Sequence, residues 1–255
     1  MHINNKSILS IKKKIIGWQK RSPFLILILA GIVGALTGLV GSLFQLSLNF
    51  IINWHKDFLK DSHTFPYYIN YFLIFIIATI MGAFAYYLVK RYAPESGGSG
   101  IPEVEGALID LRPIRWWRVL PVKFFGGLAA LGSGMILGRE GPTVQIGANV
   151  GKMISDTCKL NNKESQHTLV ASGAGAGITT AFNAPLGGIL FVMEELHEEF
   201  TYTKSSIKAV FVGCISACIT YQLIINADSV LTIPTPSAVP INSLCIFVFL
   251  GLILG

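Results

Sequence analysis

Two long apolar runs constrain this chain more than any other feature of its sequence. The first extends from Ser22 to Ile52 and the second from Tyr67 to Val89, with no charged residue in either. A helix that crosses a bilayer needs about 20 such residues, so both runs predict membrane-spanning helices. Because the first run is longer than that, we expect it to be strongly tilted or to extend beyond the hydrocarbon. A chain that is 52% hydrophobic and 13% charged is not a soluble domain.

The excess positive charge of the chain is concentrated at its N-terminus. The net charge is +6, from 20 basic and 14 acidic residues, and six of the basic residues lie within residues 1–22. The rest of the chain is therefore balanced, which argues against a nucleic-acid partner. A basic segment before the first span predicts that residues 1–21 are cytoplasmic and that the protein lies in the inner (plasma) membrane. Surface binding of this segment to anionic lipid is the alternative.

After the second apolar run the sequence changes to short helices that are interrupted by glycine and proline. The expected helices are 101–110, 116–137, 142–157, 166–182, 185–196 and 205–225. Several are too short to cross about 30 Å of hydrocarbon, and such interrupted segments are the best sequence indication of a transporter binding site. Small residues also recur at every fourth position, as in Gly147/Gly151 and Gly173/Gly177, which allows helices in lipid to pack closely.

Glu140 interrupts an apolar segment within the motif Gly138–Pro142. An ionisable side chain at membrane depth is costly and usually faces a substrate or ion pathway. Pro142 suits the first position of a helix. Glu140 would then lie just ahead of a helix N-terminus, where free amides and partial positive charge attract anions. The motif predicts an anion pathway with a protonatable gate, and a carboxylate that only caps its own helix is the alternative.

Three loop motifs, in this order, resemble those of the CLC family of chloride channels and chloride/proton antiporters. They are Gly98–Pro102, Gly138–Pro142 and the stretch from Asn183–Pro185 to Glu194–Glu195. The resemblance extends from about Ser22 to the last residue. The residues at 100–106, 115–118 and 142–147 are especially similar to those of bacterial proton/chloride exchangers. The resemblance implies an all-α polytopic membrane protein with tilted and broken helices.

The resemblance also implies roles for individual residues. Ser99, with the nearby amides of Gly100 and Ile101, would bind chloride through partial charges, which hold an anion without trapping it. An ordinary helix cap is the alternative for Ser99. Glu140 would be the gating glutamate, and Glu195 would transfer protons, with a solvated helix end as its alternative. The residues that would support the anion loops are Gly98, Pro102, Gly138, Arg139, Gly141 and Pro142. For Arg139, shaping the field for entering anions and forming a salt bridge are equally good interpretations.

Glu105 and Lys123 are both flanked by apolar residues. A buried ion is costly unless it is paired. We therefore expect an ion pair between Glu105 and Lys123.

Members of the resembled family contain two inverted repeats, with the ion site at their interface. Residues 22–226 resemble the whole first repeat, 227–240 a linker, and 241–255 the truncated first helix of the second repeat. We therefore expect that a complementary C-terminal half is required, and that the transported ions are chloride and protons. We expect no cofactor, no metal and no enzymatic activity. The family is dimeric, and helices 185–196 and 205–225 would form part of a homodimer contact. A passive chloride channel and an inactive fragment are the alternatives.

Overall fold

The computed structural model describes residues 23–60, 67–196, 203–225 and 244–254, and within these ranges it contains helices and no β-strand. The helices are α2 (Pro23–Lys60), α3 (Tyr67–Tyr92), the short 3-10 helix η1 (Pro94–Ser96), α4 (Ile101–Leu108), α5 (Trp116–Gly132), α6 (Glu140–Thr157), α7 (Lys163–Phe182), α8 (Pro185–Glu195), α9 (Lys204–Ile225) and α10 (Leu244–Leu254). The predicted all-α class is confirmed. The predicted segments 1–21 and 227–240 lie outside the described residues.

Among the residues that the structure describes, three helices are long and apolar enough to span a membrane. They are Phe24–Lys60, Tyr68–Tyr92 and Lys204–Ile225. At 1.5 Å per residue, the 38 residues of α2 are about 57 Å long, well beyond the hydrocarbon thickness of about 30 Å. The expected excess length of the first run is therefore present. It is larger than predicted, because the mixed-charge residues 54–60 continue the helix.

Among the helices expected between residues 101 and 225, two boundaries differ from the predicted ones by three residues or more. Helix α5 ends at Gly132, five residues early, because Gly134 adopts a φ of +83° that a continuing right-handed helix cannot contain. Helix α7 begins three residues early, since the side chain of Asn162 accepts a hydrogen bond from the Glu164 amide and caps it. Both differences come from local capping and turn conformations, which hydrophobic periodicity does not report.

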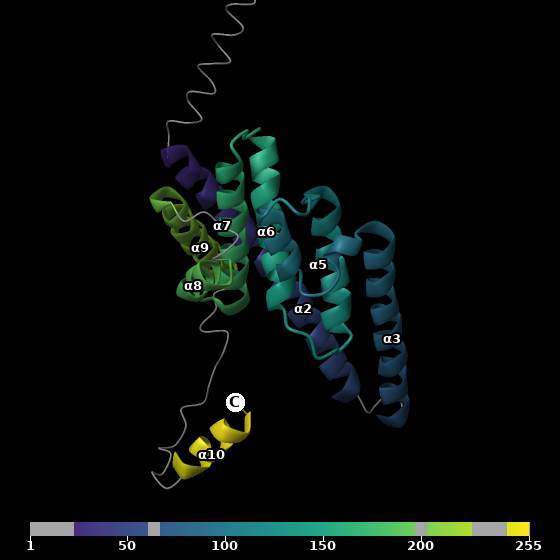
Figure 1. Ribbon diagram of the computed structural model, residues 1–255. Coiled ribbons are helices and arrows are strands. Elements are labelled where there is room, and N and C mark those ends of the chain that lie inside the picture. Colours follow the sequence, from purple (N-terminus) through teal and green to yellow (C-terminus); the bar gives the residue numbers. More distant parts are fainter. Residues whose placement is uncertain (1–22, 61–66, 197–202, 226–243, 255) are drawn as a thin grey trace, which may run out of the picture.

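Helix α7 lies at the centre of the bundle, buried almost throughout by α2, α6, α8 and α9. Figure 1 shows α2 running obliquely past these helices, with α3 and α5 beyond α6. Backbones touch where the small-residue pattern predicts it: a Cβ added at Gly147 would collide with the carbonyl of Gly173, and one at Gly177 with the carbonyl of Thr143. Close packing by small residues is thus confirmed for these pairs.

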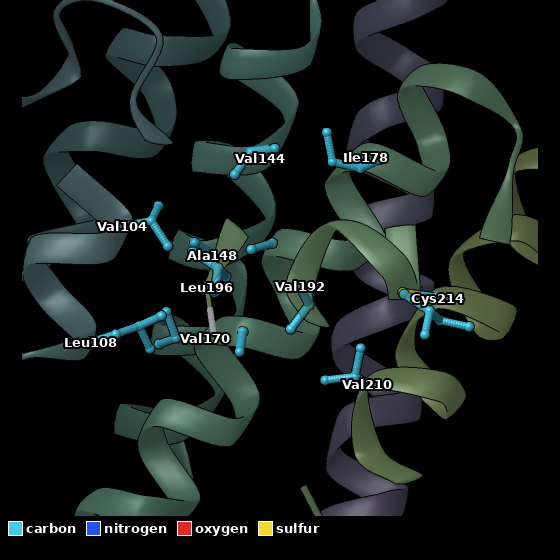
Figure 2. Close-up of a cluster of buried hydrophobic side chains, with 13 residues drawn as sticks. Val104, Leu108, Val144, Ala148, Val170, Ile178, Val192, Leu196, Val210 and Cys214 are labelled. Carbon is cyan, nitrogen blue, oxygen red and sulfur yellow. The ribbon is translucent and has the colours of Figure 1, made fainter. Parts of the chain in front are cut away.

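The main apolar core fills the space between α4, α6, α7, α8 and α9. Its side chains converge from all five helices in Figure 2, where Val104, Val144, Val170, Val192 and Val210 are among those drawn. This core fixes α4 and α8, which are only 8 and 11 residues long, against the central pair α6 and α7. Short helices that could not stand alone in lipid are thereby held at fixed positions.

The outward faces of α3 and α10 are strongly apolar. Tyr71, Phe72, Phe75 and Ile80 of α3 are each 60% exposed or more, as suits a helix that faces lipid or another apolar surface. In Figure 1, α10 lies apart from the bundle. Its predicted assignment to a second repeat stays a prediction.

Candidate anion site

The loop that precedes α4 carries Ser99 between two glycines in left-handed conformation. Gly98 has a φ of +64° and Gly100 a φ of +90°, which a residue with a Cβ adopts only with strain. Gly100 is the N-cap of α4, and Pro102 follows within the first two helical positions. The sequence Gly-Ser-Gly-Ile-Pro therefore folds into a tight turn that leads directly into the N-terminus of α4.

The donors of this loop divide into two groups. The Ile101 amide donates to Ser99 Oγ at 3.3 Å, which is the cap-like contact expected under the alternative interpretation of Ser99. The hydroxyl hydrogen of Ser99 is still available, because a hydroxyl both accepts and donates. The amides of Ser99 and Gly100 have no acceptor among the described residues. An anion could therefore be bound by these amides and by the hydroxyl, whereas the Ile101 amide is already engaged.

Glu140 is the first residue of α6, with Arg139 as the N-cap. The prediction that Pro142 opens this helix is wrong: Pro142 is the third helical residue. Proline is tolerated there because the first four amides of a helix have no intrahelical partner. Glu140 is half-buried, and its carboxylate folds back over Gly138, where a Cβ would collide with Oε2. Gly138 thus leaves room for the carboxylate itself.

Arg139 is held by the long helix α2. Its Nη1 donates to Gln45 Oε1 at 2.5 Å, and it forms no salt bridge with any residue in the described ranges. Of the two interpretations of Arg139, a charge that shapes the local field fits this arrangement better than an ion-pair partner does.

The loops of Ser99 and Glu140 touch, although they are about 40 residues apart in the sequence. A Cβ added at Gly141 would lie 2.8 Å from Ser99 Cα and closer still to the Ser99 carbonyl oxygen. Both loops line one cavity of about 810 Å³, together with Gly98, Pro142 and Lys123. The N-termini of α4 and α6 therefore meet beside a common space, where their partial positive charges act together.

Glu140 also lines a second cavity, of about 550 Å³, which is bounded by α2 and by the segment between α5 and α6. Gly138 and Leu137 border both cavities as well. Glu140 therefore lies at the boundary between the two spaces.

Lys123 of α5 anchors the Ser99 loop from beneath. Its side chain is only 4% exposed, and Nζ donates to the carbonyl oxygens of Ser96 at 3.0 Å and Gly98 at 2.8 Å. These charge-assisted bonds offset part of the cost of burying an ammonium group. The predicted ion pair with Glu105 stays a prediction.

Glu195 lies apart from the two cavities that Glu140 borders. It is the last residue of α8 and is exposed, as is Glu194, whereas the next residue, Leu196, is fully buried in the core. Glu195 lines neither of the cavities that Glu140 borders. The structure brings Ser99 and Glu140 together and leaves Glu195 separate, so its proton-transfer role stays a prediction beside the solvated-end interpretation.

Sequence reasoning missed Gln45 and Gln145. Gln45 holds Arg139 from α2, and Gln145, on α6, donates from Nε2 to the Glu95 carbonyl at 2.8 Å. In the sequence each is a long polar side chain that lies between two large apolar residues. That signal could have identified them. No group of three or more potential metal ligands occurs among the described residues.

Comparison of the sequence with known proteins identifies relatives of this chain. Residues 81–255 match the sequence model of the voltage-gated chloride channel family. The chain is 47% identical over 239 residues to proteins named H(+)/Cl(-) exchange transporter ClcA from Salmonella paratyphi B and Salmonella newport; the alignment covers 93% of this chain and 50% of each relative. The chain thus spans about half the length of the curated relatives it matches.

Solved structures of antiporters also superpose on this chain. A slow cyanobacterial Cl-/H+ antiporter superposes with a TM-score of 0.81 at 36% identity, over 90% of this chain and 54% of that one. A CLC-type fluoride/proton antiporter superposes with a TM-score of 0.69 over the same shares of the two chains, and at 20% identity it supports the fold alone. The described helices correspond to the N-terminal half of this fold.

Proposed function

This chain belongs to the voltage-gated chloride channel (CLC) family, and from that premise we propose that it is the N-terminal part of a proton-coupled chloride/proton antiporter. The observation that carries the proposal is the contact between the Ser99 loop and the first turn of α6. It puts unpaired amides, a hydroxyl and the Glu140 carboxylate around one cavity.

Chloride is the substrate that this chemistry suits. The loop offers amide and hydroxyl donors, and the ammonium group of the nearby Lys123 donates hydrogen bonds to two carbonyl oxygens. Partial charges of this kind bind a weakly hydrated anion without preventing its release, as transport requires. The ionised Glu140 competes for the same donors, and its protonation removes the competing charge. Proton uptake and chloride movement would then be linked through one side chain.

The proposal extends to the remaining parts of the transporter. Glu195, exposed at the end of α8, would take up protons at the cytoplasmic surface, separately from the chloride route. The N-terminus would be cytoplasmic and the protein would lie in the inner membrane. A complementary C-terminal half would complete the pathway, and α8 and α9 would contribute to a homodimer contact, for which the exposed Leu186, Leu190 and Ile215 are suited.

The test is a flux assay in liposomes that measures chloride and protons together. The chain is reconstituted alone and with a separately expressed second repeat from a relative, and we expect chloride-driven proton flux only for the combination. Glu140→Gln should abolish proton coupling in the assembled protein. Glu195→Gln should stop proton movement while chloride still moves, and Glu194→Gln, the exposed neighbour, is the matched control.

Each outcome has a clear meaning. Chloride flux without proton flux in the unaltered assembly would indicate a passive channel. Equal loss of both fluxes in Glu195→Gln would contradict its proton-transfer role. Proton-coupled exchange that persists in Glu140→Gln would refute the gating assignment.

A further inference from the structure

Three buried oxygen atoms beneath the Ser99 loop have no hydrogen-bond donor among the described residues. They are Glu95 Oε1, Gln145 Oε1 and Asn149 Oδ1. Gln145 is 2% exposed and Asn149 is 3% exposed, so bulk water does not reach these amides. Buried acceptors without a donor are rare in folded proteins, because their lost hydration is not replaced.

All three side chains line one small cavity of about 20 Å³ between η1, α6 and the segment that precedes α5. A cavity of about 10–15 Å³ or more can contain one water molecule when its walls offer two to four polar partners. An occupant here must donate hydrogen bonds or carry positive charge, because the unpaired atoms are all acceptors. That requirement excludes an anion and fits water, which has two hydrogens to donate.

Gln145 connects this cavity to the loop that carries Ser99. Its Nε2 donates to the Glu95 carbonyl at 2.8 Å, so the amide binds the start of the segment Glu95–Gly100. Its Oε1 lies against the other end: a Cβ added at Gly100 would be 2.5 Å from this atom. Gln145 therefore contacts both ends of the loop, which Lys123 also holds at Ser96 and Gly98.

The orientation of an amide group is fixed only when both of its ends have partners. In Gln145 the nitrogen has a partner and the oxygen does not. A water molecule in the cavity would complete the set, since it can donate to Gln145 Oε1 and to one of the two other acceptors.

We propose that the cavity between Glu95, Gln145 and Asn149 is a binding site for one ordered water molecule, and that Gln145, oriented by this water, is a positioning residue for the Ser99 loop. The second part of this inference rests on the proposed function, whereas the first does not.

Arg115 is the competing occupant. It lines the cavity, its side chain is exposed, and its guanidinium group has no partner among the described residues. A guanidinium group that turned inward could donate to the same oxygens. The size of the cavity argues against an inward-turned guanidinium group, because a cavity of about 20 Å³ accommodates one water molecule and not a planar group of four heavy atoms.

The first experiment is a structure of the assembled protein at a resolution that shows ordered water. We expect an isolated density peak within hydrogen-bonding distance of Gln145 Oε1 and of at least one of the other two oxygens. A cavity without density, or density continuous with the Arg115 side chain, would overturn the water site. This result does not depend on whether the protein transports chloride.

The second experiment tests the positioning role by titrating the purified assembly with chloride in a calorimeter. Gln145→Met has a similar length but neither amide atom, and we expect chloride affinity to fall on the order of tenfold, the effect of misplacing one hydrogen-bond donor. Gln166→Met makes the same chemical change at the start of α7, where Gln166 bonds to Leu160, and is the control.

Thermal stability of each variant separates positioning from general destabilisation. If Gln145→Met and Gln166→Met lower stability equally and leave chloride affinity equal, Gln145 has only a structural role and the positioning inference fails. If the unaltered assembly binds no chloride, it is the proposed function that fails, and the water site is still judged by its density.

Discussion

Replacing Gly141 by alanine tests whether the contact between the two loops matters for anion binding. The added Cβ would lie 2.8 Å from Ser99 Cα and 2.9 Å from the Ser99 carbonyl carbon, whereas ordinary contact begins at 3.4 Å. The Ser99 loop must therefore move by more than about 0.6 Å, since the opposing atoms are backbone, the Ser99 carbonyl oxygen is nearer still than the Cα, and the interior is closely packed.

The energetic consequences can be separated. Alanine in place of glycine within a helix contributes about 1 kcal/mol of stability, and overpacking costs about 1–3 kcal/mol, so the fold should survive with a net loss of no more than about 2 kcal/mol. Displacing one donor from the anion should cost about 1.5 kcal/mol, which is roughly a tenfold loss in chloride affinity.

The assay is chloride efflux from liposomes that contain the assembled protein, at chloride concentrations above and below saturation. Gly127→Ala is the control, because Gly127 lines the same cavity and its nearest neighbour would be Phe44 Cε2 at 3.3 Å. We expect Gly141→Ala to raise the half-saturating chloride concentration about tenfold and Gly127→Ala to leave it close to that of the unaltered protein. Equal half-saturation in the two variants would refute the argument that this contact positions Ser99.

Two further predictions concern stability. Gly38→Ala should destabilise the protein relative to Gly31→Ala, because the Cβ at Gly38 would lie 2.7 Å from the Ala217 carbonyl oxygen, whereas the Cβ at Gly31, one heptad earlier on α2, meets nothing closer than 3.5 Å. Both changes gain about 1 kcal/mol of helix propensity, so the difference between the two variants in thermal unfolding measures the overpacking cost alone, which we expect to be about 1–3 kcal/mol. Equal melting temperatures of the two variants would contradict this prediction. At the ends of α4 and α7, the hydrogen bond from Lys163 lowers the pKa of the exposed Asp110 carboxyl. The stability that this pair contributes is present above the unfolded pKa of about 4 and is lost as the pH falls through the lower folded pKa. The unaltered protein should therefore lose more stability than Asp110→Asn on acidification, and parallel pH profiles would show that the pair contributes nothing.

The parts of the fold that could be predicted from the sequence are those set by hydrophobicity and by small residues. Uninterrupted apolar runs gave the long helices, and the four-residue spacing of glycine indicated where backbones touch. Both signals are local and repeat along the chain. The start of α6 was missed because proline is compatible with any of the first positions of a helix, so Pro142 alone could not locate it.

The partners of buried polar groups could not be predicted in the same way. Lys123 bonds to the Ser96 and Gly98 carbonyls, two partners that were not predicted from the sequence, and its expected ion pair with Glu105 stays a prediction. Backbone carbonyls are present at every residue, so no sequence pattern marks the two that a particular lysine will reach.

The bonds from Lys123 to these carbonyls bear directly on how an anion could be bound. In a planar trans peptide the carbonyl and the amide point in opposite directions. The Gly98 carbonyl faces the Lys123 ammonium, so the Ser99 amide in the same peptide unit is directed away from it. A lysine bound to the loop's own carbonyls orients the donors on the loop's other side, and the amide of Ser99 has no acceptor among the described residues. The buried charge would thus act on a bound anion through the backbone, and a neutral replacement of Lys123 would disturb the direction of those donors as well as the local field.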